Sequence, residues 1–267
     1  MTESKMLTLT MRDIVNMEAH LVEVGRLTKM PFKTSYRLAR MMTHIKPELA
    51  TFSSKRDDLI RLYGSATEEN PENFAVEPNK VEEFQTAINE FLSESIEVMP
   101  WHPITPTEFG EAAASITPLQ LAAMFPLLAP VVPENAATFN LTLKMLTEME
   151  AAIGAVARLT DMPIETSYRL AHLVATIQPA LEKLPRDRAE LVRKFGVKIE
   201  GTEDQYNILN HVVPDFNEAL EEMLETVVPI NNWAPLSLNS FGEKAELNIT
   251  AVQIAALMPL LDLNNEE

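Results

Sequence analysis

The 267-residue chain is 46% hydrophobic, which is enough to build a buried core in one large domain or in two ordinary ones. It contains no cysteine, so disulfides and thiolate chemistry are excluded. Its net charge of −17 argues against direct nucleic-acid binding and against anionic membrane surfaces, because both need a basic face, and no apolar run approaches the roughly 20 residues that span a bilayer.

A sequence repeat divides the chain. The block Thr34-Ser35-Tyr36-Arg37-Leu38-Ala39 returns as Thr166-Ser167-Tyr168-Arg169-Leu170-Ala171, a shift of 132 residues, and the same shift relates Trp101 to Trp233. A repeat of this length indicates a duplicated domain rather than a short solenoid unit. We therefore predict a first helical unit over residues 1–128, a proline-rich joint over 129–138 and a second helical unit over 139–267.

Each copy is predicted to begin with a short strand and an amphipathic helix. Apolar and β-prone polar residues alternate over 7–10 and over 139–142, which is typical of a strand. Apolar residues then recur every three or four positions, which predicts a helix over residues 12–28. Thr10 and Asp13 have the spacing of a capping box at its start.

Prolines and glycines mark the next boundaries. Pro31 separates the first helix from the second, which Thr34 would cap and which would run to about Pro47. A third helix would follow and end at Gly64, because glycine readily adopts the left-handed conformation that terminates a helix. The second copy carries the same residues 132 positions later: Pro163, Thr166, Pro179 and Gly196.

The rest of each copy is predicted to be an acidic helix between extended pieces. Residues 74–76 and 96–101 favour an extended chain, and residues 79–94 have one apolar face, which predicts a helix. A last helix is expected over 117–128 and, in the second copy, over 250–261, where one extra residue raises the shift to 133.

A proline-rich segment joins the copies. Pro126, Pro130 and Pro133 fall within eight residues, which makes a stiff joint rather than a flexible tether. Two copies on a stiff joint should pack on each other. The predicted fold is mainly α with short β-strands (α+β), as two tandem homologous helical units in a pseudo-twofold arrangement that resembles a fused homodimer.

Charge is unevenly spread within each copy. In the first copy, lysine and arginine lie up to Arg61, with Lys80 as the exception, and residues 68–97 are rich in glutamate. The second copy repeats this division after Lys198. Two interpretations stay open: solvated faces that partly neutralise each other, or an acidic docking surface displayed twice.

Catalytic patterns do not recur with the repeat. A histidine in one copy faces a different residue in the other, as His44 faces Thr176 and His172 faces Arg40. The spacings of zinc and calcium sites, glycine-rich phosphate loops and a nucleophile elbow are missing from the sequence. We therefore expect no enzyme, no metal site and no cofactor.

Arginine and tryptophan do recur, and both allow two interpretations. Arg37 and Arg61 match Arg169 and Arg193, as part of a larger recurring set that also includes Arg26 and Arg56 with their counterparts Arg158 and Arg188. They could clamp a small anion, or pair with the recurring Glu18, Glu90 and Glu111. Trp101 and Trp233 could anchor a partner protein or cover the core. Tyr36 and Tyr168 are predicted to be core residues.

The order of these features resembles a family of small uncharacterised phage-encoded helical proteins. The resemblance lies in the T-S-Y-R-L-A helix, in the R-x-x-L-[IV]-R-x-[YF]-G pattern at 56–64 and 188–196, and in the closing I-T-x-x-Q-[LI]-A-A helix. Members are about one copy long and richer in lysine, so the doubling and the tryptophan are differences. The resemblance implies a viral origin and no catalytic activity.

These features lead to an expectation for function. The leading hypothesis is a non-enzymatic interaction or structural protein, phage-encoded, acting as a virion component or an assembly accessory. The alternatives are an acidic inhibitor that binds a host protein and a small-anion binder that uses the recurring arginines. The expected partner is another protein, viral or host, without nucleic acid or membrane, with further oligomerisation allowed. The expected location is the host cytoplasm or the virion.

Overall fold

The computed structural model describes residues 5–67, 73–202, 205–246 and 248–262. The described chain is mainly helical and has short antiparallel strands, so the predicted α+β class is confirmed at that level. It divides into two compact units, Met1–Ile104 and Thr105–Glu267.

The first unit begins with a strand that pairs with a strand from its far end. β1 (Lys5–Thr10) runs antiparallel to β4 (Ser95–Trp101), with a register shift between Leu7 and Thr8. α1 (Met11–Gly25) follows β1 directly, and Thr10 and Asp13 form the predicted capping box at its start. The strand and the first helix predicted from the sequence are therefore confirmed.

The core of the first unit lies between α1 and α2 (Phe32–Tyr63). The buried residues of α1 recur every three or four positions, as the sequence pattern predicts, and α2 contributes its own buried stripe. These side chains are Met11, Ile14, Met17, Leu21, Val24, Leu38, Met41 and Ile45, none more than 2% exposed. Pro31 lies in the turn between the two helices, which is the predicted boundary.

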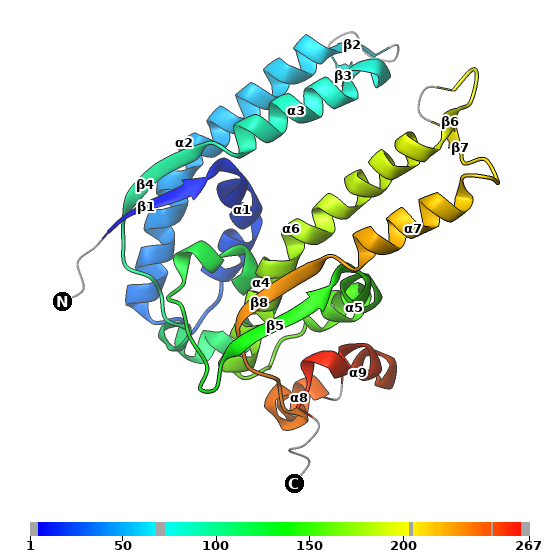
Figure 1. Cartoon of the computed structure of the whole chain (residues 1–267). Helices are drawn as coiled ribbons and strands as arrows, with labels where there is room; N and C mark the ends of the chain where they lie inside the picture. Colours follow the sequence, from blue (N-terminus) through cyan, green and yellow to red (C-terminus); the bar gives the residue numbers. More distant parts are fainter. Residues whose placement is uncertain (1–4, 68–72, 203–204, 247, 263–267) are drawn as a thin grey trace. The chain divides into compact units, whose positions relative to one another are not determined.

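α2 then runs out as one arm of a helical hairpin with α3 (Val81–Leu92), as Figure 1 shows. The tip is a small pair of strands, β2 (Gly64–Ala66) and β3 (Phe74–Val76), and a 3₁₀ turn, η1 (Pro78–Lys80), leads into α3. Ring contacts join the arms: Phe52 stacks on Phe91 with 6.0 Å between centroids, and Tyr63 meets Phe84 at 6.4 Å.

Two predicted helices are one helix in the structure. α2 continues through Pro47, and its counterpart α6 (Ile164–Phe195) continues through Pro179 and Pro185. An interior proline costs about 3 kcal/mol because it removes a main-chain hydrogen bond and crowds the preceding turn. We attribute the continuation to the packing of the second hairpin arm along the outer half of each helix, which sequence periodicity does not reveal.

The predicted caps at the two ends of this helix are wrong. Thr34 and Thr166 lie inside the first turn and are buried, and Pro31 and Pro163 take the N-cap positions. Gly64 ends α2 as predicted, but with φ −119° and ψ 173° it is extended rather than left-handed. The chain passes from the helix straight into β2, and a Cβ at Gly64 would collide with the carbonyl oxygens of Ile60 and Ala75.

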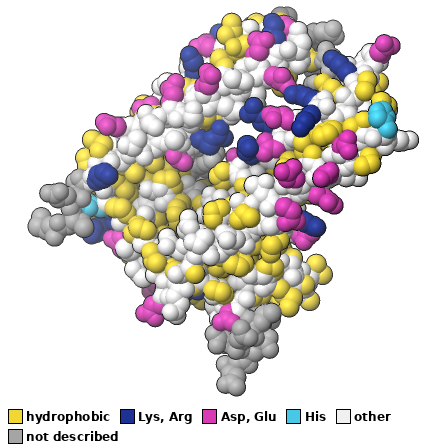
Figure 2. Space-filling view, viewed as in Figure 1, with side chains coloured by type: hydrophobic (Ala, Val, Ile, Leu, Met, Phe, Trp, Pro, Cys, Tyr) yellow, Lys and Arg dark blue, Asp and Glu magenta, His cyan; other side chains and the backbone are white. Residues whose placement is uncertain are grey.

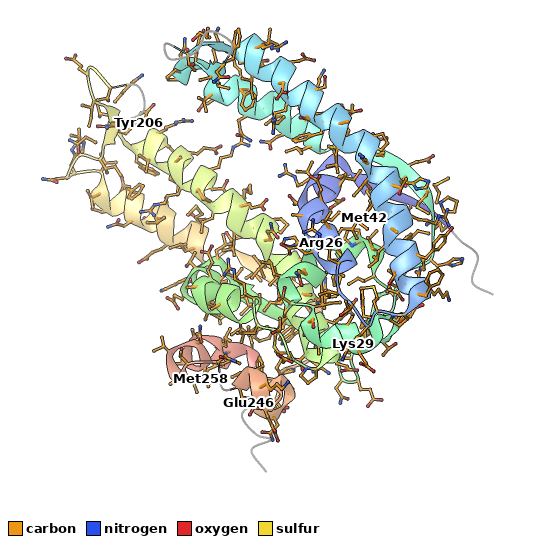
Figure 3. The ribbon with its side chains drawn as sticks, turned by 180° about the vertical axis from the view of Figure 1, so that it is seen from behind. Arg26, Lys29, Met42, Tyr206, Glu246 and Met258 are labelled. Atoms are coloured by element: carbon orange, nitrogen blue, oxygen red, sulfur yellow. The ribbon has the colours of Figure 1, made fainter. Side chains whose placement is uncertain are left out.

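The second unit repeats the same order of elements. β5 (Ala137–Thr142) pairs with β8 (Val227–Trp233), α5 (Leu143–Val156) follows β5, and α6 and α7 (Val213–Leu224) form a second hairpin, visible in Figure 1. The tip of this hairpin carries the short pair β6 (Val197–Lys198) and β7 (Tyr206–Asn207), where Figure 3 labels Tyr206.

The second unit also holds the end of the first sequence copy. Residues 105–128 form η2 (Pro106–Ser115), α4 (Pro118–Ala123) and η3 (Phe125–Leu127). The corresponding segment of the second copy forms η4 (Leu238–Phe241), α8 (Glu243–Glu246), α9 (Ala251–Leu257) and η5 (Met258–Leu260). The predicted boundary at 129–138 follows the sequence repeat and stays a prediction, whereas the compact units meet at residue 104.

Candidate interaction surfaces on helices α2, α4, α6 and α9

The segment that ends the first copy is seated on the helices of the second unit by main-chain hydrogen bonds. The Leu119 amide donates to the Ala157 carbonyl at 2.9 Å, and the Asp161 amide donates to the Ala114 carbonyl at 2.6 Å. Leu121 is fully buried. These bonds fix α4 against the end of α5 and the start of α6, so its position is set by directional contacts as well as by packing.

An aromatic cluster extends the contact between this segment and α6. The Phe125 ring lies 5.4 Å from the Tyr168 ring and 5.5 Å from the His172 ring, measured between centroids. The Tyr168 hydroxyl donates to the Ala129 carbonyl at 3.0 Å and accepts from the Val131 amide at 3.1 Å. One tyrosine therefore binds both polar groups of the joint and holds it against α6.

Burial changes the titration of both α6 residues in the cluster. Desolvation raises the pKa of the Tyr168 phenol above 10.0, and the hydrogen bond from Val131 opposes this in part. Desolvation lowers the pKa of His172 below 6.5, because the charged imidazolium is less well solvated there than in water. Both groups therefore favour their neutral forms.

A cleft of about 420 Å³ lies beside α4. Its apolar lining is Leu119, Ile153, Ala157, Val174, Ile177 and Leu181, and Glu150, Arg158 and Glu182 supply charges of both signs. The Arg158 guanidinium also donates to the Gly154 carbonyl at 2.7 Å. An apolar floor with a mixed-charge rim suits a protein side chain better than a small anion.

In the first unit, the face of α2 that corresponds to the covered face of α6 is exposed to solvent. Tyr36 is 55% exposed whereas its counterpart Tyr168 is 5% exposed, and Ala39 is exposed whereas Ala171 is fully buried. The prediction of a core tyrosine is confirmed for Tyr168 and wrong for Tyr36. The reason is that Tyr168 is covered by the joint and by η3, which a repeat of α2 alone cannot supply.

The closing segment of the second copy has both buried and exposed apolar side chains. Leu257 and Leu260 are at most 3% exposed, but Val252 is 80%, Met258 47% and Ile254 37% exposed. Figure 3 shows Met258 on this segment. Residues 252 and 254 are two positions apart, so their side chains lie on opposite sides of the helix. Ile254 lines a pocket of about 230 Å³ together with Leu257 and Leu261. The repeat contained the apolar positions of this segment, since residues 117–128 and 250–261 share them.

The two tryptophans that were candidate anchors are buried. Trp101 is 4% exposed and Trp233 is 2% exposed, each at the end of its strand. The Arg37 guanidinium carbon lies 5.1 Å from the centre of the Trp101 ring, a cation–π arrangement. These positions fit the core interpretation of the tryptophans.

The candidate arginines are spread along the long helices. Arg37 and Arg61 lie on α2, and Arg169 and Arg193 lie 132 positions later on α6. A separation of 24 residues is about 36 Å along a helix, so neither pair can hold one small anion. Arg61 and Arg193 are exposed in the last turns, where a cation favours the helix dipole. The pairing with Glu18, Glu90 and Glu111 stays a prediction.

Within the described ranges, no group of three or more histidine, aspartate or glutamate side chains is placed to hold a metal ion. None of the described helices combines the length and apolar character that crossing a membrane requires. Comparison of the chain with protein-family models, with curated proteins and with solved structures gave no match.

Proposed function

We propose that the chain is a non-enzymatic interaction or structural protein built from two tandem homologous units. The observation that carries the proposal is the apolar patch that Phe32 and Tyr36 form on α2, where both side chains are exposed to solvent. Phe32 is 85% exposed and stacks on Tyr36 at 6.5 Å. Exposed apolar strips on rigid elements are typical of protein-binding sites.

The pseudo-twofold relation between the copies stays a prediction. Tyr168 is 5% exposed and Tyr36 is 55% exposed, so the two equivalent tyrosines have different surroundings.

We place the protein in a phage, as a virion component or an assembly accessory, on the strength of the sequence resemblance. The test is native mass spectrometry of the tagged protein isolated from the cells that encode it, with proteomics of purified particles beside it. The proposal expects complexes heavier than one chain that contain other polypeptides. Recovery as a single chain of 29.9 kDa in every preparation would contradict it.

An acidic inhibitor of a host protein is the second candidate, because the outer arms of the hairpins carry exposed carboxylates. Glu83 and Glu90 are exposed on α3, and Glu218 and Glu221 are exposed on α7. Figure 2 shows acidic side chains along both hairpins, with lysine and arginine among them. The predicted acidic residues Glu68, Glu69, Glu72, Glu203 and Asp204 lie outside the described residues.

The two candidates differ in how binding responds to salt. Capture through carboxylates should weaken steeply as ionic strength rises, since exposed charges are screened within about 8 Å at physiological salt. Capture through the apolar patch on α2 should persist in high salt. Replacing Glu83 and Glu90 by glutamine should abolish partner binding under the inhibitor hypothesis and leave it unchanged under the leading proposal.

A further inference from the structure

The turn between α1 and α2 and the first half of α2 form a basic region in an acidic chain. Residues 24–47 contain six lysine or arginine residues and no aspartate or glutamate, so their formal charge is +6 in a chain of net charge −17. The carboxylates nearest in sequence are Glu23 and Glu48, which bound the segment. All six basic residues except the partly buried Arg37 are exposed. They are Arg26, Lys29, Lys33, Arg37, Arg40 and Lys46.

The matching segment of the second copy does not carry this charge. Residues 156–179 hold two basic and two acidic residues, so their formal charge is zero. The basic character therefore belongs to the first copy and is not a requirement of the shared fold. In the second copy, Asp161 stands in place of Lys29, Glu165 in place of Lys33, His172 in place of Arg40 and Gln178 in place of Lys46.

The two segments also differ in whether another part of the chain covers them. On α6, Phe125 contacts Tyr168 and His172, and Ala171 is fully buried. The covering residues 118–127, which include α4 and η3, carry no charged side chain. A neutral segment thus lies on the neutral face of α6, whereas the basic face of α2 is exposed to solvent.

Aromatic side chains lie within the basic region. Phe32 stacks on Tyr36 with 6.5 Å between ring centroids, and the Arg40 guanidinium carbon lies 6.0 Å from the centre of the Tyr36 ring. These three residues follow one another at intervals of four, so they line one face of α2. Figure 3 shows Arg26 and Lys29 at the turn before this face. We call the exposed surface the basic–aromatic face; it consists of Phe32, Lys33, Tyr36, Arg40, Thr43 and Lys46.

We propose that the basic–aromatic face binds an acidic segment of another polypeptide. Carboxylates of the partner lie against Lys33, Arg40 and Lys46, and an apolar side chain of the partner packs on Phe32. The face extends for about 21 Å along α2, which is long enough for several turns of a helix or for an extended segment. The inference rests on the proposed function, because it names the kind of partner that the same apolar patch would bind.

The charged and apolar parts of the face have different roles. Exposed charges at the rim of an interface select the partner and raise its association rate more than they slow its dissociation. The Phe32 ring, which is 85% exposed, supplies apolar area whose burial holds the complex and is not screened by salt. Salt should therefore slow the formation of the complex and leave the formed complex intact.

Two other anionic partners fit the face less well. Single-stranded nucleic acid needs aromatic rings with free faces for base stacking, but the Tyr36 ring already contacts Phe32 on the preceding turn and Arg40 on the following turn. An anionic bilayer repels a chain of net charge −17. Within residues 24–47, which the structure describes throughout, Phe32 and Tyr36 are the exposed large apolar side chains, and two rings offer little area for insertion.

Selection of binders from a library of random peptides tests the inference, with the full chain as bait. The peptides enriched on the wild type should carry aspartate or glutamate together with a large apolar side chain. The double variant Lys33→Gln/Lys46→Gln tests the charge and leaves the Phe32–Tyr36–Arg40 contacts in place. Its control is Lys55→Gln/Lys144→Gln, which removes the same charge at exposed positions outside residues 24–47.

Binding rates of an enriched acidic peptide separate the two roles. In low salt, Lys33→Gln/Lys46→Gln should bind it about tenfold more slowly, whereas the control should stay within about twofold of the wild type. Phe32→Ala should raise the dissociation rate at least ~tenfold, because the peptide loses the apolar area on which it packs. Urea unfolding checks that each variant is folded, which the exposure of these side chains allows.

Enrichment of neutral or basic peptides, or of none whose binding needs Phe32, overturns the inference. So does an equal loss of association rate in the control. Binding of a single-stranded oligonucleotide or of phosphatidylserine vesicles that is lost in Lys33→Gln/Lys46→Gln would also overturn it. The proposed function fails by a different result, which is recovery of the wild type as a single chain from the cells that encode it.

Discussion

Tyr36 and Tyr168 are the same residue in the same six-residue block, with opposite surroundings. The Tyr168 hydroxyl binds the Ala129 carbonyl and the Val131 amide and the residue is buried, whereas Tyr36 is 55% exposed. The difference comes from a segment about 40 residues away in the chain for Tyr168, which the block itself cannot encode. Two residues at equivalent positions of the sequence repeat can therefore make different contacts and contribute differently to stability.

We predict that Tyr168→Phe lowers the free energy of unfolding by about 1–3 kcal/mol, because it leaves the Val131 amide and the Ala129 carbonyl without their partner. Tyr36→Phe is the matched control at the equivalent position and should change stability by no more than about 0.5 kcal/mol. Urea unfolding of both variants measures the difference. Equal effects would show that the joint is not held by this hydroxyl.

The titration of His172 predicts how stability depends on pH. Its folded pKa lies below 6.5, so the unfolded chain takes up a proton on acidification before the folded chain does. The contribution of neutral His172 to the free energy of unfolding is therefore fully present above pH 6.5, and it is lost as the pH falls through the folded pKa.

In His172→Gln, the free energy of unfolding should decrease less between about pH 7.5 and pH 5 than it does in the wild type. Urea unfolding at a series of pH values measures both slopes. An unchanged slope in His172→Gln would exclude the burial effect.

At the scale of elements, local signals predicted the parts and missed how they join. The strand β1, the capping box of α1, the turn at Pro31 and the strand β4 follow from periodicity and from short-range hydrogen bonding, and the structure has them where predicted. The continuous α2 was missed, because a proline signals a break whereas the packing of α3 sustains the helix.

The candidate site shows the same limit. Tyr36 and Tyr168 lie in the same repeated block, but their exposure depends on whether another segment covers them. The tryptophans and arginines were chosen because they recur. A residue can recur because both copies need it for folding, as well as because both copies use it for binding. Trp101 and Trp233 are buried at equivalent strand ends, which is what a shared fold requires.

Gly64 and Gly154 predict opposite outcomes for the same substitution. Gly64→Ala places a Cβ against the carbonyl oxygens of Ile60 and Ala75, so it should lower the free energy of unfolding by about 1–3 kcal/mol. Gly154→Ala lies inside α5, where the nearest atom is the Arg158 guanidinium at 3.5 Å. It should raise stability by about 0.5–1 kcal/mol, because alanine loses less backbone entropy in a helix.

Thermal and urea unfolding of the two alanine variants check the signs. The close approach at Gly64 is between a helix end and a strand, so the loss should appear in the hairpin first. A stabilising Gly64→Ala would mean that β2 and β3 do not pack as tightly as the structure has them.

At the scale of the whole molecule, the segments that close the two sequence copies lie on different helices. α4 packs on α6, which also holds the joint through Tyr168, and α9 packs on α5. The apolar patch of Phe32 and Tyr36 on α2 is exposed to solvent. Exposed apolar patches of this kind are typical of protein-binding sites.

Native mass spectrometry of the tagged protein in low and in high salt tests this account most directly. The account predicts that the chain is recovered with other polypeptides, that these complexes persist in high salt, and that Phe32→Glu releases the partners because a carboxylate then lies in the apolar patch. Recovery of the wild type as a single chain of 29.9 kDa in every preparation would contradict it.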